Sequence, residues 1–456
     1  MQSTYLAADK KIGARRSVER WSAAARRAAS GPAASTQRPG LAVIAEATGS
    51  VTDTTRAPLA LVALFCAAET FSMAGFALVP SLLPRLSEQW SLSATEGGWL
   101  GGIFFLGYIL AVPLLVSLTD RLDARRVYLA CAGLSGIALA GFASLADSLS
   151  AALCWWSLAG LGLAGTYMPG LKAMTDRLPV AVQSRATAFY TATFGVGVGL
   201  SYLWIELLQG LMPWPSLFAV AAAGAALSVL LVWRGVSPGK SSLRPRVGHG
   251  QWRNVLHDRR ILAFCGGYFG HNWELFGFRA WLVAYLTWMH AMSPDAWTAR
   301  PGWIAALATF LAVPASILGN EGAQHWGRKR WLQSVMPLSC ILALIVGLSG
   351  SQSSRLLVPV ILVYAASMNL DSAALTAGLL TETPPEQRGT ALALYSSIGF
   401  AGGFIGPVAF GAALDAFGRN THAGWAAGFV TLACGVGCGR WAIGRIESQG
   451  SGIGRQ

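Results

Sequence analysis

The chain has 456 residues, of which 54% are hydrophobic and 12% are charged, and its formal net charge is +13. Soluble domains carry about 25% charged residues, so the composition excludes a water-soluble globular protein of this size. The positive charge could indicate a nucleic-acid partner, but we expect the Lys and Arg residues to lie in cytoplasmic loops, with no nucleic acid bound. The seven cysteines all fall in apolar segments, in neither a disulfide nor a metal-ligand pattern.

The first 55 residues differ from the rest of the chain. They are rich in Arg, Ala and Ser and contain no apolar run long enough to cross a membrane. We interpret 1–55 as a basic, disordered cytoplasmic tail. Two alternatives are a helix over 10–27 on the inner membrane surface, and a wrongly assigned translation start.

Apolar runs long enough to cross about 30 Å of hydrocarbon as helices recur through the remaining sequence. Helices satisfy their own backbone polar groups in lipid, so we predict an all-α membrane protein with twelve transmembrane helices. The predicted spans are 58–83, 96–118, 126–147, 150–171, 185–208, 214–234, 261–289, 303–325, 331–349, 355–380, 389–416 and 424–443. An irregular, basic linker over 235–260 separates six-helix bundles at 56–234 and 261–443, and 444–456 forms a second cytoplasmic tail.

The distribution of charge predicts the orientation. If both termini are cytoplasmic, 29 of the 34 Lys and Arg residues lie on the cytoplasmic side and one, Arg279, lies inside a span. The outer loops then hold four: Arg85, Arg300, Arg355 and Arg419. Positive residues concentrate in cytoplasmic loops, so we expect a multi-pass protein of the inner (plasma) membrane with both termini in the cytoplasm.

The two halves repeat each other. Arg185 opens the fifth span and Arg388 opens the eleventh, 203 residues later, with Ala-Thr-Ala-Phe-Tyr after the first and Gly-Thr-Ala-Leu-Ala-Leu-Tyr after the second. Glu69 in the first span has a counterpart in Glu274 of the seventh, 205 residues later. Repeated halves place the substrate path between them, near the middle of the membrane.

The loop after the second span holds Asp120, Arg121, Arg125 and Arg126. These residues match the charged positions of a known family pattern, Gly-x-x-x-Asp-Arg-x-Gly-x-Arg-Arg/Lys, whereas Val116 and Asp123 replace its two glycines. After the eighth span the pattern returns in Arg328, Lys329 and Arg330, with Gln324 in place of the acidic residue. Over residues 58–443 the sequence resembles the major facilitator superfamily (MFS), which implies two pseudo-symmetric six-helix bundles.

The resemblance also implies a role for the basic loop. In the family, its acidic residue interacts with the opening of the eleventh helix, where the helix dipole is positive. Asp120, Arg121, Arg125 and Arg126, with Arg328, Lys329 and Arg330 in the second half, are therefore candidates for a conformational latch that holds the halves together in the outward-facing state. The alternative is a solvated charged turn that only enforces topology.

Polar residues inside the predicted spans are candidates for substrate binding or proton coupling, because buried charge is costly in a membrane. These candidates are Glu69, Tyr167, His271, Glu274, Arg279, Asn369 and Asp371. His271 and Glu274 share a helical face, and a carboxylate beside an imidazole can exchange protons at physiological pH. Arg279 is either a counter-ion to Glu274, which we favour, or an anchor for an anionic substrate. Asp371 could instead cap a helix or pair with a loop arginine.

We therefore predict a secondary transporter that moves a small solute by alternating access, coupled to protons, as a monomer in the bilayer without metal or cofactor. A drug or metabolite efflux antiporter is an alternative, although the fifth span lacks the Gly-Pro signature of the family's drug/proton antiporters. A solute sensor that transports nothing is a second. An enzyme is not expected, because His-x-x-Glu at 271–274 occurs once and lacks partners, and no ATP-binding Gly-rich loop is present.

Overall fold

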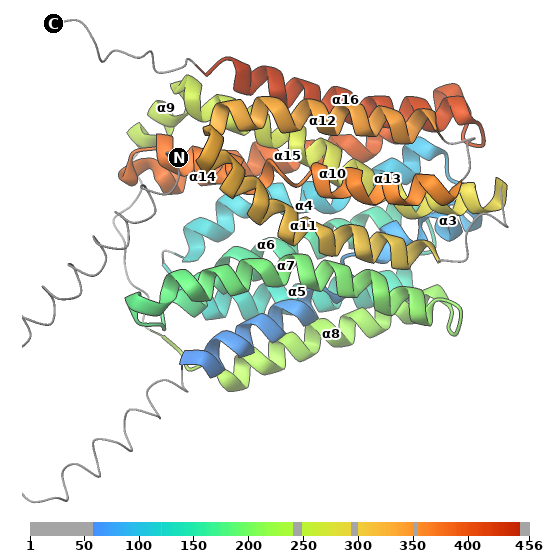
Figure 1. Ribbon diagram of the computed structural model, residues 1–456. Helices are drawn as coiled ribbons and strands as arrows, with labels where there is room; N and C mark the ends of the chain where they lie inside the picture. The colour runs from blue at the N-terminus through green and yellow to red at the C-terminus, as the bar shows by residue number, and fades with distance from the viewer. Residues whose placement is uncertain (1–57, 120, 240–248, 293–299, 350–353, 447–456) are drawn as a thin grey trace, which may run out of the picture. The chain divides into compact units, whose positions relative to one another are not determined.

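The computed structural model describes residues 58–119, 121–239, 249–292, 300–349 and 354–446. All regular structure within these ranges is helical, and the helices run side by side (Figure 1). After a helical segment at 58–72 and a short 3-10 turn, Met73–Gly75, the helices of the first half are α3 Leu78–Gln89, α4 Ala94–Thr119, α5 Ala124–Leu145, α6 Leu149–Thr175, α7 Val180–Leu208 and α8 Trp214–Gly235. The second half comprises α10 Arg259–Met292, α11 Pro301–Trp326, α12 Arg328–Leu348, α13 Ser354–Ser367, α14 Ser372–Glu382, α15 Arg388–Phe417 and α16 His422–Gly444.

Among the described residues, eleven helical segments are long and apolar enough to cross a membrane. The remaining predicted span is the seventh, 261–289, which corresponds to α10 and is not among the eleven because polar and charged residues interrupt its apolar sequence. Its 34 residues exceed the roughly 20 that a crossing requires. The predicted all-α membrane fold is thus confirmed.

Two differences from the expected layout concern helix continuity. The tenth span is two helices, because the chain turns at 368–371 between α13 and α14 and places Asn369 and Asp371 in the break. The linker is not irregular throughout, since α9 (His249–His257) forms after the last of its prolines. Transporter sites often lie where a membrane helix is interrupted, so the first difference bears on function.

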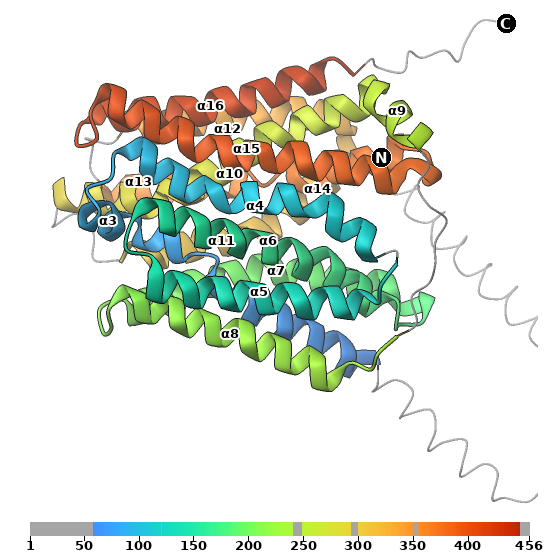
Figure 2. The same ribbon diagram turned by 180° about the vertical axis from the view of Figure 1, so that it is seen from behind.

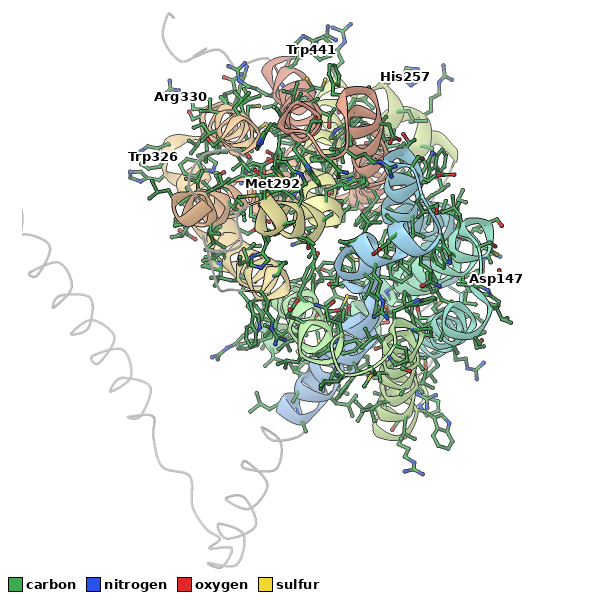
Figure 3. All side chains as sticks on the ribbon, turned by 90° about the vertical axis from the view of Figure 1, so that its right-hand side faces the viewer. Asp147, His257, Met292, Trp326, Arg330 and Trp441 are labelled. Atoms are coloured by element: carbon green, nitrogen blue, oxygen red, sulfur yellow. The ribbon has the colours of Figure 1, made fainter. Side chains whose placement is uncertain are left out.

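The helices sort into two groups that follow the sequence repeat. Viewed along the helices, the blue-to-green first half and the yellow-to-red second half occupy different sides (Figure 3). The groups meet where α3 packs on α10, α4 on α15 and α10, and α7 on α11. From behind, α4 lies between α15 of the other half and α6 of its own (Figure 2).

Glycines permit the closest approach between the halves. A Cβ atom at Gly98 of α4 would overlap the carbonyl oxygen of Pro407 in α15, and one at Gly102 would overlap that of Phe404. A Cβ at Gly411 would likewise overlap the backbone of Ala94 at the start of α4. Small residues let membrane helices pack backbone to backbone, which explains part of the high glycine content.

Candidate functional site

Glu69 forms the first buried polar cluster, within the first half. Its side chain is fully buried, and its Oε2 accepts hydrogen bonds from the Tyr190 hydroxyl on α7 at 3.0 Å and the Ser72 hydroxyl at 3.3 Å. Its Oε1 has no hydrogen-bond partner among the described residues. Tyr167 stacks on Tyr190 with ring centroids 6.0 Å apart, so this candidate belongs to the Glu69 cluster.

Glu274 forms the corresponding cluster in the second half. It is also fully buried, and its Oε1 accepts hydrogen bonds from the Ser339 hydroxyl on α12 at 2.6 Å and the Tyr364 hydroxyl on α13 at 3.0 Å. Its Oε2 again lacks a partner in the described chain. Each half therefore holds a buried carboxylate with one oxygen engaged by hydroxyl groups and the other unpartnered.

His271 pairs with Asp371. Its Nδ1 lies 2.7 Å from Asp371 Oδ1, with both side chains almost fully buried. Neither atom has a hydrogen bond of suitable geometry among the described residues, so the two groups lie at the distance of an ion pair without forming an aligned hydrogen bond. Asp371 precedes α14 but its side chain makes no capping hydrogen bond, whereas the neighbouring Asn369 amide donates to the Ala365 carbonyl at 2.8 Å.

Arg279 has a different environment from the one we favoured. No described carboxylate lies within 4 Å of its guanidinium, so it does not form an ion pair with Glu274. The physical reason is helical spacing, because five residues separate the two side chains and place them on different faces of α10. The side chain is 9% exposed, lies 5.8 Å from the Phe276 ring centroid and lines two small cavities.

The basic loops contact their own halves. Asp120 lies outside the described residues. Arg125 is buried and donates to the Trp233 carbonyl at 2.7 Å, whereas Arg121 and Arg126 are exposed. In the second half, Arg328 donates to the Thr381 hydroxyl at 3.1 Å, Lys329 donates to the Ile446 carbonyl, and Arg330 is exposed.

Asp123 connects this loop to two distant segments. One carboxylate oxygen accepts from the Arg125 backbone N–H at 3.1 Å, which caps α5, and the other accepts from the Gly239 N–H at 2.7 Å. Arg177, at the end of the fourth span, donates to both oxygens at 2.8 and 2.9 Å. Burial raises the pKa of Asp123, but the hydrogen bonds from Gly239, Arg177 and Arg125 outweigh it, so the pKa lies below its usual value.

Two carboxylates that the sequence did not single out join the halves at the end opposite these loops. Asp415 of α15 accepts hydrogen bonds from the Ala94 N–H at 2.9 Å, and from the Thr95 N–H and hydroxyl at 2.7 Å, at the start of α4. Glu206 of α7 accepts from the Gly302 N–H at 3.1 Å at the start of α11. Each carboxylate caps a helix of the other half, where the dipole favours negative charge.

The contact between α7 and α11 does not continue to the opposite end. Gly199 and Gly195 of α7 pack against Phe310 and Val313 of α11. The same face of α7 continues at helical spacing through Thr191, Ala188 and Ser184, and these three residues are exposed. The two halves are therefore in contact at the end with the carboxylate caps and separated along α7 at the end with the basic loops.

The described residues contain no group of three His, Cys, Asp or Glu side chains placed to hold a metal ion. All seven cysteines are unpaired. The polar clusters above are thus a candidate site for solute and proton binding. Ser339 and Tyr364 were not predicted as site residues, because the sequence does not indicate which face of an apolar helix a polar residue occupies.

Comparison with known proteins decides the family. The profile of the Major Facilitator Superfamily matches residues 64–299 and 292–454. The chain belongs to this superfamily. The predicted resemblance is confirmed, and this MFS protein is a multi-pass membrane protein of a transporter family.

Solved MFS structures share its fold. A bacterial homologue of the human lysosomal transporter Spinster, in an inward-facing and unoccupied conformation, superposes with a TM-score of 0.71 at 15% identity, covering 85% of this chain and 97% of that one. The nucleoside transporter NupG gives a TM-score of 0.68 at 14% identity, covering 85% and 100%. At these identities the likeness concerns the fold alone.

Relatives with similar sequences include transporters. The niacin transporter NiaP of Acinetobacter baylyi is 25% identical over 26% of this chain and 27% of that protein. The uncharacterized transporter YgaY of Escherichia coli K12 is 27% identical over 40% and 46%. The human voltage-gated purine nucleotide uniporter SLC17A9 is 26% identical over 60% and 67%. The chain therefore aligns with less than half the length of NiaP and YgaY.

Proposed function

We propose that this MFS protein is a proton-coupled secondary transporter that moves a small solute across the inner (plasma) membrane by alternating access, with both termini in the cytoplasm. The relatives support transport as such. Their names specify niacin in one case and purine nucleotides in another, so they favour no single solute.

The observation that carries the proposal is the pair of half-satisfied buried carboxylates, Glu69 and Glu274. An uncompensated charge inside a membrane is costly, and binding a proton removes it. In both residues one oxygen is free of hydrogen bonds and available to take a proton without breaking an existing contact. His271 lies on the same helix as Glu274, and its contact with Asp371, directly before α14, offers a second group that can bind a proton.

The arrangement of the halves supports alternating access. In the topology inferred from charge, the end closed by Asp415 and Glu206 is the outer one and the exposed stretch of α7 faces the cytoplasm. The present conformation is then inward-facing. In the opposite conformation these caps separate, and the cytoplasmic loops, with Asp120 and Arg126, approach the start of α15 as the latch.

The test begins with a solute-panel thermal-shift assay on the purified protein, because a ligand stabilises the folded form. The stabilising solute is then offered to proteoliposomes with and without a pH gradient. We expect accumulation in wild type only with the gradient. Glu274→Gln mimics the protonated carboxyl, so we expect it to abolish accumulation while sparing solute exchange.

Glu321→Gln is the matched control, since Glu321 is an exposed acid on α11. It should accumulate solute as wild type does. Normal accumulation by Glu274→Gln would make Glu274 structural and leave Glu69 as the leading proton carrier, to be tested as Glu69→Gln. Wild-type accumulation that ignores the pH gradient would disprove proton coupling.

A further inference from the structure

Arg279 is a buried cation that no carboxylate among the described residues neutralises. Its guanidinium has no carboxylate within 4 Å and donates no hydrogen bond to a described residue. The Phe276 ring centroid lies 5.8 Å from the guanidinium carbon. Arginine stays charged in proteins, so loss of a proton cannot remove the positive charge from this site.

The neighbouring acids are already engaged. Glu274 accepts two hydroxyl hydrogen bonds, and Asp371 lies against His271. Neither reaches Arg279 in this conformation. The residue is 9% exposed, and its planar fork of N–H donors has no acceptor among the described residues, so it is suited to an oxyanion supplied by a bound solute.

Arg279 also lies where the two halves meet. Its backbone carbonyl accepts a hydrogen bond from the Tyr202 hydroxyl of α7 at 3.3 Å. One adjoining cavity is lined mainly by apolar side chains, with Thr309 and Asn369 as polar members. The other is aromatic and lies between the halves, with Phe104 and Trp156 from the first half beside Phe276 from the second.

We infer that Arg279 is the anchor for the anionic group of the transported solute, and that the solute is an organic carboxylate with an apolar body. The carboxylate oxygens accept from the guanidinium fork, and the apolar body packs in the aromatic cavity between the halves. This inference rests on the proposed transport function and adds a substrate class to it. A solute held by groups of both halves stabilises their contact, as alternating access requires.

The test measures the thermal stability of purified full-length protein in detergent at constant ionic strength, with sodium benzoate, its neutral isostere benzamide, sodium phosphate or sodium chloride added. We expect benzoate to raise the melting temperature with a saturating dose, and the other three to have little effect. Arg279→Gln should weaken the apparent benzoate affinity at least tenfold, and Arg279→Lys less, because it keeps charge but loses the fork.

Arg177→Gln is the matched control. The Arg177 side chain is 16% exposed, but its guanidinium is already paired with Asp123 at 2.8 Å. This variant should lower the baseline melting temperature while leaving the benzoate response unchanged.

Equal stabilisation by chloride or phosphate would show an inorganic anion site and overturn the substrate assignment. So would a benzoate response that persists in Arg279→Gln, equal stabilisation by benzamide, or no response in wild type. Proteoliposomes separate this inference from the proposed function. Arg279-dependent benzoate binding without solute transport would contradict only the proposed transport function. Transport that is unaffected by Arg279→Gln would contradict only the role of Arg279 as the anchor.

Discussion

The carboxylate of Asp415 lies at the start of α4, with its Oδ2 2.7 Å from both the backbone nitrogen and the hydroxyl of Thr95. The contact has a counterpart in the repeat, because Glu206 at the end of α7 caps the start of α11. Spans five and eleven are equivalent in the two halves, as are spans two and eight. Each half thus contributes one carboxylate that caps a helix of the other half.

Removing these caps should open the closed end. Hydrogen bonds to charged groups contribute about 1.5–3 kcal/mol each. We expect the double variant Asp415→Asn, Glu206→Gln to shift the conformational equilibrium by about 1–2 kcal/mol, a factor of roughly 5–30. Spin labels at Leu211 and Phe417, both exposed near this end, report the shift as a longer distance distribution.

The labels require replacement of the exposed Cys154, Cys434 and Cys438. Glu88→Gln serves as the control, since Glu88 is an exposed acid near the same end and makes no described contact with the other half. An unchanged distance distribution in the double variant would show that the caps do not hold this end closed.

Glycine packing makes a second, independent prediction about the same interface. Alanine at Gly98 or Gly102 introduces a Cβ atom that overlaps the backbone of α15, so the closed end should separate. We expect the same lengthening between the labels at Leu211 and Phe417. Gly133→Ala on α5 is the control, because a Cβ there meets no atom within 4 Å. Wild-type distances in both alanine variants would contradict the close packing.

The Asp123–Arg177 pair should stabilise the first half in a pH-dependent way. The folded pKa of Asp123 is lowered, so its contribution is fully present above the unfolded value of about 3.9 and is lost as pH falls through the folded value. We expect Asp123→Asn to reduce stability by about 1–3 kcal/mol at pH 7, measured by thermal unfolding.

The difference between wild type and Asp123→Asn should shrink as the pH falls below 4. Asp147→Asn is a suitable control, since Asp147 lies in an exposed turn at the other end of the same helix. A difference that is constant down to the lowest accessible pH would show that the Asp123 charge is not responsible.

His271 and Asp371 should make the conformation sensitive to pH. Protonation of His271 creates an ion pair that ties α10 to the break before α14. In wild type we expect the distances between the labels at Leu211 and Phe417 to change with pH, because His271 carries a charge only when it is protonated. Asp371→Asn should flatten this dependence, while His325→Asn, at an exposed position on α11, should not. A wild-type response retained in Asp371→Asn would exclude the pair.

Topology can be tested with reporters that are active only outside the cytoplasm. A fusion after Gly239 should be silent and one after Arg300 active, because the basic linker is expected to stay inside. The reverse pattern would invert every assignment of inner and outer ends made above.

The fold was predictable because membrane crossing imposes length and composition on each helix, and the repeat fixes the order of the halves. The candidate charges were found for the same reason, since each interrupts an apolar run. Their partners were not. Tyr190 aligns with Tyr395 in the repeat, yet Tyr190 donates to Glu69 while Tyr395 contacts Thr376. Which hydroxyl meets which carboxylate depends on helix rotation and tilt, which sequence periodicity does not fix.

Asp123 shows a different limit. It appears in the sequence as a departure from the family glycine. An aspartate directly before a helix is also a common N-cap, and this signal could have placed it correctly. Its contacts with Arg177 and Gly239 could not have been foreseen, because they join segments far apart in the chain.

The continuity of α10 has a mechanical consequence. His271, Glu274 and Arg279 lie on one unbroken helix, with about 12 Å along its axis between the first and the last. Because the helix is continuous, it tilts as a unit. We therefore expect a movement caused by a change of charge at His271 or Glu274 to displace Arg279 as well. The tenth span, by contrast, is interrupted at 368–371, so α13 and α14 are not held to move as one helix.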